Sequence, residues 1–337
     1  MTNREAVLET LNFRQSGRVP YNVDLTGQMR EKMLADPAGR AAWEKANNHI
    51  ASRSLGRPSV EVKPGYFQDE FGVIWNKTGV DRDIGVIDGK LIASPADLAA
   101  YELPAVDEAG VRRSCEALAA DRENFTIADI GFSLFERAWT LCSMEDLLCY
   151  MITEPDFVHR LMQRITDYNL KLIDISLEYD IDCSMFGDDW GQQKGLIMGP
   201  ALWREFVLPY LKQMYGRARS RKGRFVCQHS CGDIHEIFDD LIAAGLNIYQ
   251  TFQPEIYDIR KWKPILDGRL TVWGAISTQR DLPGKTPGEI YEIATDTIRA
   301  MWHNGGYIAA PTHSVPPDVP VENIIAMLRA FEDYREC

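Results

Sequence analysis

The sequence lacks several features that would place it in other classes of protein. It contains no uninterrupted run of about 18 apolar residues, the length that a membrane helix requires. The N-terminal segment MTNREAVLETLNFRQ has no apolar core of the kind that a signal peptide carries. We therefore expect a cytoplasmic protein that does not enter a membrane.

Positive charge and cysteine are also scarce. Lys and Arg number 37 against 49 Asp and Glu, so the formal net charge is −12. Because phosphate binding needs a basic face, this balance disfavours a nucleic-acid partner and favours a small molecule or another protein. Seven cysteines in 337 residues form no dense framework, so reduced thiols are expected.

The C-terminal half shows a regular alternation of predicted strands and helices. Buried strands are predicted at 223–230, 246–252, 270–277 and 306–312, and residues at helical spacing follow each of them. No Gly-rich dinucleotide fingerprint follows a strand, so a doubly wound open sheet has little support. Four successive strand–helix units predict a parallel sheet that is buried on both faces.

The N-terminal half adds further strands. They are predicted at 19–25, 124–132 and 184–189, with one more, less clearly marked, within 48–75. Segment 66–93 has the pattern of antiparallel hairpins, and we expect it to form an excursion over one mouth of a barrel. The length and the strand order predict one (β/α)8 TIM barrel over residues 1–337.

Polar side chains gather at the C-terminal ends of the predicted strands, where barrel enzymes build their active sites. In chain order they are Asp24, Asp129, Asp188, Asp189, His229, Cys231, Gln250, Gln253, Ser277 and His313. Each one alone could be a cap or a loop hydrogen bond. Their shared placement, which packing does not require, predicts a functional site at this mouth.

The sharpest local motif is His229-Ser230-Cys231. Side chains two apart in an extended chain point the same way, so His229 and Cys231 can address one point, and both are ordinary zinc ligands. His313 follows the last strand, which a barrel returns to the same mouth. Three protein ligands would leave one zinc position open, as in catalytic sites. Cys227 shares the parity of Cys231 and is its competitor, although it lies deeper in the strand.

A helix is predicted to begin soon after this motif, at about Asp233. Asp233 could cap it, with Glu236 three residues on. Cys231 would then lie beside a helix N-terminus, whose partial positive charge favours a thiolate.

Asp188 and Asp189 form the second cluster, at the end of another strand. Two adjacent carboxylates cannot both be buried without partners, so one is expected to act in the pocket and the other to cap a loop or helix. The alternative is a solvated acidic turn. Substrate contacts are predicted for four further residues, namely Asp24, Phe132, Trp190 and Gln253.

These motifs lie in segments that resemble the uroporphyrinogen decarboxylase superfamily, in the same order. The segments are GFSLFERAWTLCSMEDLLCYMITEP (131–155), FGDDWGQQKGLIMGPALWREFVLPYLKQMY (186–215) and CQHSCGDIHEIFDDLIAAGLNIYQTFQP (227–254), continuing to APTHSVPPDVPVENI (310–324). The resemblance implies a (β/α)8 barrel. True decarboxylases carry an arginine-rich N-terminal segment that grips substrate carboxylates, and the corresponding stretch here, 23–30, lacks that cluster.

A second branch of the superfamily contains corrinoid-dependent methyltransferases. Those that act on methylcobamide and a thiol carry H-x-C and a later Cys as zinc ligands. Here His229 and Cys231 match the H-x-C, but His313 occupies the later position. A neutral imidazole in place of a thiolate leaves the zinc one unit more positive, which suits a Lewis acid that polarises a methoxy oxygen.

The resemblance therefore implies a zinc-dependent methyltransferase that moves a methyl group between a small methylated substrate, preferably a methoxy compound, and a corrinoid protein. Zn²⁺ would be held by His229, Cys231 and His313, and Asp188 or Asp189 would complete its shell or protonate the leaving oxygen. The chain lacks the D-x-H-x-x-G pattern of a cobalamin-binding domain, so the corrinoid is expected on a partner protein. The alternatives are a metal-free decarboxylase and a methylcobamide:thiol methyltransferase.

Overall fold

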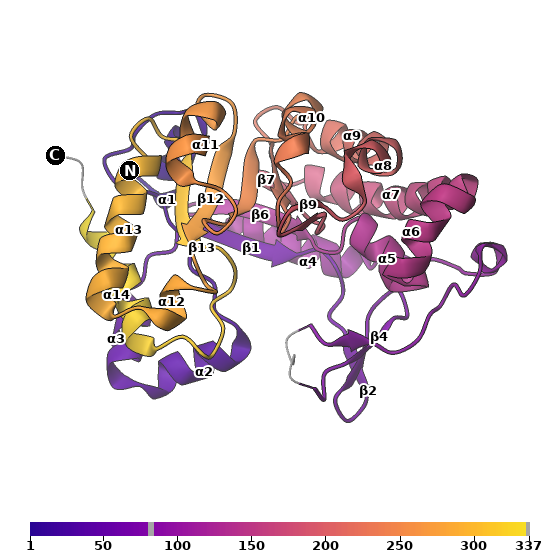
Figure 1. The fold of residues 1–337 in the computed structure, drawn as a ribbon, viewed down its shortest axis with the longest axis horizontal. Coiled ribbons are helices and arrows are strands. Elements are labelled where there is room, and N and C mark those ends of the chain that lie inside the picture. The colour runs from indigo at the N-terminus through magenta and orange to yellow at the C-terminus, as the bar shows by residue number, and fades with distance from the viewer. Residues whose placement is uncertain (80–83, 335–337) are drawn as a thin grey trace.

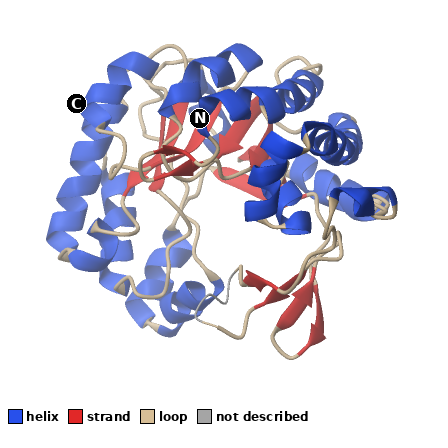
Figure 2. Ribbon diagram, turned by 45° about the vertical axis from the view of Figure 1, so that its right-hand side comes forward, coloured by secondary structure: helices blue, strands red, loops and turns tan. Residues whose placement is uncertain are grey.

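A computed structural model describes residues 1–79 and 84–334. At its centre a curled parallel sheet has the order β1-β6-β7-β10-β11-β12-β13, and helices cover its outer face (Figures 1 and 2). The strands are β1 Ile50–Ser54, β6 Phe125–Ile130, β7 Cys183–Gly187, β10 Phe225–His229, β11 Ile248–Phe252, β12 Thr271–Ile276 and β13 Tyr307–Pro311. Apart from segment 19–25, the predicted strands lie in this order, and the less clearly marked one is β1.

The segment 19–25 closes the curled sheet into a barrel. It forms isolated parallel bridges to the β13 side, at Tyr21 to Ala309 and at Leu25 to Val315. On its other side the His49 N–H, next to β1, donates to the Tyr21 carbonyl at 2.9 Å. The predicted first strand thus occupies the eighth place in the ring, but through bridges and not through a continuous ladder. The (β/α)8 prediction is confirmed.

The barrel has a filled interior. One core cluster combines Val7 and Leu11 of α1 with inward-facing strand residues, among them Ile127, Cys227 and Trp273. A second, larger cluster lies between the strands and the surrounding helices. Because both faces of the sheet are covered, β12 and β13 read as continuous apolar runs in which every residue is buried.

The helices follow the strands around the barrel. They are α1 Asn3–Leu11, α2 Gly27–Ala35, α3 Pro37–Lys45, α4 Glu108–Ala120, α5 Phe135–Cys142, α6 Met144–Thr153, α7 Pro155–Leu177, α8 Gly199–Phe206, α9 Leu208–Ala218, α10 Phe238–Ala244, α11 Ile259–Leu266, α12 Asp281–Gly284, α13 Pro287–Met301 and α14 Val321–Asp333. Within the described ranges, no helix is both long and apolar enough to cross a membrane.

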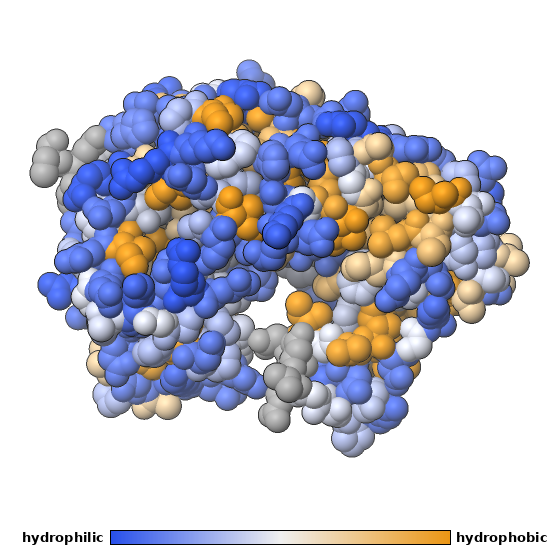
Figure 3. All heavy atoms as spheres, in the orientation of Figure 1, coloured by the Kyte–Doolittle hydropathy of each residue, from blue (hydrophilic) through white to orange (hydrophobic). Residues whose placement is uncertain are grey.

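A small antiparallel sheet stands beside the barrel mouth. Its strands are β2 Val60–Lys63, β3 Tyr66–Gln68, β4 Ile74–Asn76 and β5 Val86–Ile87. Trp75 of β4 packs edge-on against Phe132 after β6, with ring centroids 5.3 Å apart. The surface is hollowed between this sheet and the α2 side of the molecule (Figure 3).

The start of α13 tests whether the predicted capping residues stabilise the helix. The Glu289 N–H donates to the Thr286 hydroxyl, and the Glu289 carboxylate accepts from the Thr286 N–H at 2.9 Å, which completes the predicted capping box. We expect Thr286→Ala to lower the free energy of unfolding by about 1 kcal/mol, because one helix N–H loses its acceptor. Urea unfolding measures this, and Thr286→Ser, which keeps the hydroxyl, should stay near the wild type. An equal loss in both variants would refute the capping role.

Candidate active site

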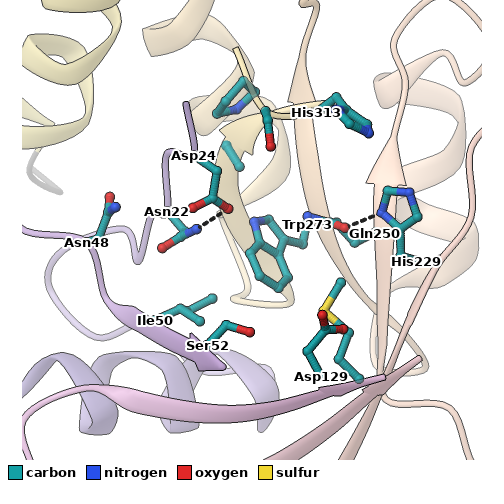
Figure 4. A pocket seen from close by; sticks show the side chains of 14 residues that line it. Asn22, Asp24, Asn48, Ile50, Ser52, Asp129, His229, Gln250, Trp273 and His313 are labelled. Carbon is teal, nitrogen blue, oxygen red and sulfur yellow. Dashed lines mark hydrogen bonds between the residues drawn. The ribbon is translucent and has the colours of Figure 1, made fainter. Parts of the chain in front are cut away.

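The C-terminal ends of the strands enclose a cavity of about 410 Å³. Its lining comes from most strands of the ring and consists of Asn22, Asp24, Asn48, Ile50, Ser52, Asp129, Met185, His229, Gln250, Trp273, Ala310, Pro311, His313 and Ser314. Figure 4 shows Asp24 on one side of the Trp273 ring, and His229 and His313 on the other. The barrel thus brings side chains that are far apart in the sequence together around one cavity.

His229, Cys231 and His313 lie together at this mouth. One donor atom from each residue lies within 4.8 Å of the others. The His229 Nε2 and Cys231 Sγ are 3.7 Å apart, and tetrahedral zinc with ordinary bond lengths would separate such a pair by about 3.6 Å. The two imidazole rings meet edge to face, with centroids 5.7 Å apart. The donor set and its spacing therefore fit a zinc ion.

Gln250 orients the His229 ring. Its Oε1 lies 2.5 Å from the His229 Nδ1, and an amide oxygen can only accept, so Nδ1 carries the proton. The Nε2 lone pair is then left to face Cys231 and a metal. A hydrogen bond of this kind fixes the tautomer of metal-binding histidines in general. Gln250 was noted from its position at a strand end, but its role follows only from the geometry.

Asp189 contacts two of the three clustered residues. Its Oδ1 accepts from the Cys231 N–H at 2.7 Å and lies 3.5 Å from the His229 Nε2. Its side chain remains 36% exposed. Asp189 is not among the residues that line the cavity, but it lies against two of the three clustered residues.

The loop that carries Cys231 is held by a close contact between two glycines. A Cβ on Gly232 would lie 2.2 Å from the Gly191 carbonyl carbon, and a Cβ on Gly191 would lie 2.6 Å from the Cys231 oxygen. Gly232 also has φ +78°, which disfavours any side chain. Gln253 supports the same loop by accepting from the Gly232 N–H at 2.7 Å. Gln253 does not line the cavity, so its predicted substrate contact is replaced by a positioning role.

The predicted helix N-terminus beside Cys231 is wrong. A short 3₁₀ turn, His235–Ile237, follows the loop, and α10 begins only at Phe238. Asp233 accepts from the His235 N–H and not from the residue predicted to complete a cap. Burial, and then the charge of Asp189, raises the pKa of the Cys231 thiol. A bound cation, and not a helix dipole, is therefore what would favour its thiolate.

Asp188 and Trp190 do not reach the cavity, contrary to their predicted roles. The Asp188 carboxylate is fully buried and accepts from the N–H groups of Phe135 and Glu136, at 2.9 and 2.6 Å, and from the Trp190 indole at 2.6 Å. Trp190 is fully buried and packs on Trp203. Both residues tie the end of β7 to the start of α5. They support the site and do not touch a substrate in it.

Phe132 also lies outside the main cavity. It lines a smaller neighbouring cavity of about 190 Å³ beside the hairpin sheet and packs between Trp75 and Trp139. Of the predicted substrate contacts, only Asp24 lines the main cavity. Cys227, the competitor of Cys231, is fully buried in the barrel interior. It is not among the residues that line the opening.

Three further residues, Asp129, Trp273 and Glu136, received no specific role from the sequence. Asp129 and Trp273 line the cavity. Burial raises the pKa of Asp129 to about 6, and burial also raises the pKa of Asp24. The pKa of Glu136 is raised well above its usual range by burial and by the charges of Asp189 and Asp188. The sequence placed Asp129 at a strand end. Nothing in the sequence distinguished Trp273 from a core residue of its strand, or Glu136 from other helix residues.

Comparison with known proteins agrees with this architecture. A solved structure described as a methyltransferase from Methanosarcina mazei superposes with a TM-score of 0.72 at 18% identity and covers 99% of both chains. A uroporphyrinogen decarboxylase of Coxiella burnetii is 25% identical over 283 residues, which are 76% of this chain and 73% of the relative. The methylcobamide:CoM methyltransferase MtaA of Methanosarcina barkeri is 23% identical over 194 residues, 58% of this chain and 54% of its own length.

The family model described as uroporphyrinogen decarboxylase (URO-D) matches residues 80–334. This match covers well over half of the chain and includes all three clustered ligand candidates. The resemblance first seen in the sequence motifs is thereby confirmed, and the chain belongs to the uroporphyrinogen decarboxylase family.

Proposed function

We propose that this chain is a zinc-dependent methyltransferase that moves a methyl group from a small methoxy compound to a corrinoid carried by a partner protein. The convergence of His229, Cys231 and His313 at the mouth of the cavity is the observation that carries the proposal. The presence of a methylcobamide:CoM methyltransferase among the relatives supports this branch of the family.

The clustered residues would hold Zn²⁺ through two imidazoles and one thiolate. When bound, the metal would supply a Lewis acid next to the leaving oxygen of the methyl donor. Gln250 keeps the His229 Nε2 directed at that point, and Asp189 fixes the Cys231 backbone. The Asp189 carboxylate lies close enough to these residues to hold a proton for the departing oxygen.

The family contains decarboxylases, which makes decarboxylation the second candidate. The cavity argues against their tetrapyrrole substrate, because none of the described residues that line it is Lys or Arg. Eight substrate carboxylates would instead meet Asp24 and Asp129. Like charges that face one another across one cavity repel.

His313 distinguishes the proposed reaction from methyl transfer to a thiol. A site with two thiolates holds an electron-rich zinc that suits a bound thiolate nucleophile. With one thiolate and two neutral imidazoles, the metal would be more cationic and a stronger Lewis acid for an ether oxygen. The ligand set therefore favours demethylation of a methoxy compound.

Methyl transfer to free Co(I) cobalamin provides the direct assay. We expect the zinc-loaded protein to convert Co(I) to methyl-Co(III) with a methoxyarene as donor, and not with methylamines, because only the ether presents an oxygen to the metal. Absorbance spectroscopy follows the reaction. In His313→Cys, zinc content should persist while the rate falls, since a thiolate makes the metal a weaker Lewis acid. Wild-type demethylation in this variant with full zinc would refute the charge argument.

The two neighbouring aspartates should differ in what their loss affects. Asp188→Asn should destabilise the fold by about 1–3 kcal/mol, because an amide N–H₂ would face N–H donors that now meet a carboxylate oxygen. Asp189→Asn should leave stability nearly unchanged and lower turnover by about 10²- to 10⁴-fold, as expected for loss of general acid help. Thermal unfolding and the cobalamin assay measure the two effects. Normal turnover in Asp189→Asn would remove its proton-transfer role.

A further inference from the structure

The charge of the cavity lining restricts the ligands that the cavity can hold. Its 14 lining residues include two carboxylates, Asp24 and Asp129, and no Lys or Arg. Figure 4 shows both carboxyl groups directed into the open space, from opposite sides of the Trp273 ring. The charged side chains of the lining are therefore acidic.

Asp129 is the deeper of the two carboxylates. It projects from β6, and within the described part of the chain its side chain accepts no hydrogen bond from any other residue. Burial raises its pKa to about 6, and the charge of Asp24 contributes to the increase. The lone pairs of this cavity-lining carboxylate are therefore open to a ligand that supplies a donor.

Asp24 is only partly satisfied by the protein. One of its oxygens accepts from the Asn22 side-chain amide at 3.0 Å, which leaves acceptor capacity toward the cavity. Ile50, Met185 and Trp273 supply apolar surface to the same lining. The lining thus combines an aromatic and aliphatic wall with two groups that only accept hydrogen bonds when ionised.

We infer that the cavity takes an aromatic methyl ether whose ring also bears a hydrogen-bond donor, a hydroxyl or an ammonium group, and that Asp24 and Asp129 exclude carboxylated ligands. This inference rests on the proposed function for the methoxy end of the ligand. A donor group satisfies the open lone pairs of Asp129 and Asp24. A carboxylate there would set acceptor against acceptor and like charge against like charge in a partly desolvated space.

Binding can be measured without methyl transfer. Three ligands share one ring and differ in charge: 2-methoxyphenol, 4-hydroxy-3-methoxybenzoate and 4-hydroxy-3-methoxybenzylamine. We expect titration calorimetry on the zinc-loaded full chain, with no corrinoid present, to give a Kd for the benzoate at least about tenfold above that of the phenol. The benzylamine should bind at least as tightly as the phenol. Benzoate binding as tight as phenol binding, or no binding of any ligand, would overturn the inference.

Variants that remove one carboxylate test whether Asp24 and Asp129 cause the difference between benzoate and phenol binding. In Asp129→Asn and Asp24→Asn the ratio of benzoate to phenol Kd should fall toward one, while circular dichroism confirms folding. Glu44→Gln removes one exposed charge from α3, outside the cavity, and should keep the wild-type ratio. An unchanged ratio in both Asn variants would overturn the role of the acids. If the benzoate binds more weakly than the phenol but no methyl group reaches Co(I), the result would support this inference and contradict only the proposed function.

Discussion

The site depends on the hydrogen bonds that fix the loop between β10 and the turn before α10. Asp189 accepts from the Cys231 N–H, Gln253 accepts from the Gly232 N–H, and the Gly191–Gly232 contact leaves no space for a side chain. Trp190 donates its backbone N–H to the Ser230 hydroxyl at 3.0 Å. Because these contacts come from the segments that follow β7 and β11, neighbouring strand ends position the Cys231 loop.

Below this loop, Asp188 joins the end of β7 to the first turn of α5. Its carboxylate is buried without a cation, and three N–H donors compensate for the lost hydration. Asp189, its neighbour, faces the opposite way and remains partly exposed. One dipeptide therefore divides its two carboxylates between support of the fold and contact with the metal candidates.

The sequence predicted the barrel well because its strands follow one simple rule. Strands buried on both faces appear as apolar runs, and the helices between them keep helical spacing, so β10 to β13 were found in order. His229 and His313 were also found, since strand ends in a barrel share one mouth. Side-chain direction within a turn was not predictable. Trp190 and Gln253 follow strand ends as His313 does, yet tertiary packing turns them away from the cavity. Trp273 was missed for the opposite reason, because an inward-facing strand residue near the mouth reads as core.

The central claim is that His229, Cys231 and His313 form one zinc site, and X-ray absorption at the zinc edge tests it most directly. Protein purified with zinc should bind close to one ion per chain. The spectrum should require one sulfur at about 2.3 Å and two imidazole nitrogens at about 2.0–2.1 Å, with a light-atom ligand in the remaining position. Replacement of Cys231 by Ser should remove the sulfur contribution, whereas replacement of Cys227 should leave it. A spectrum with two sulfurs, a sulfur signal that survives in Cys231→Ser, or a protein that binds no zinc would contradict the account.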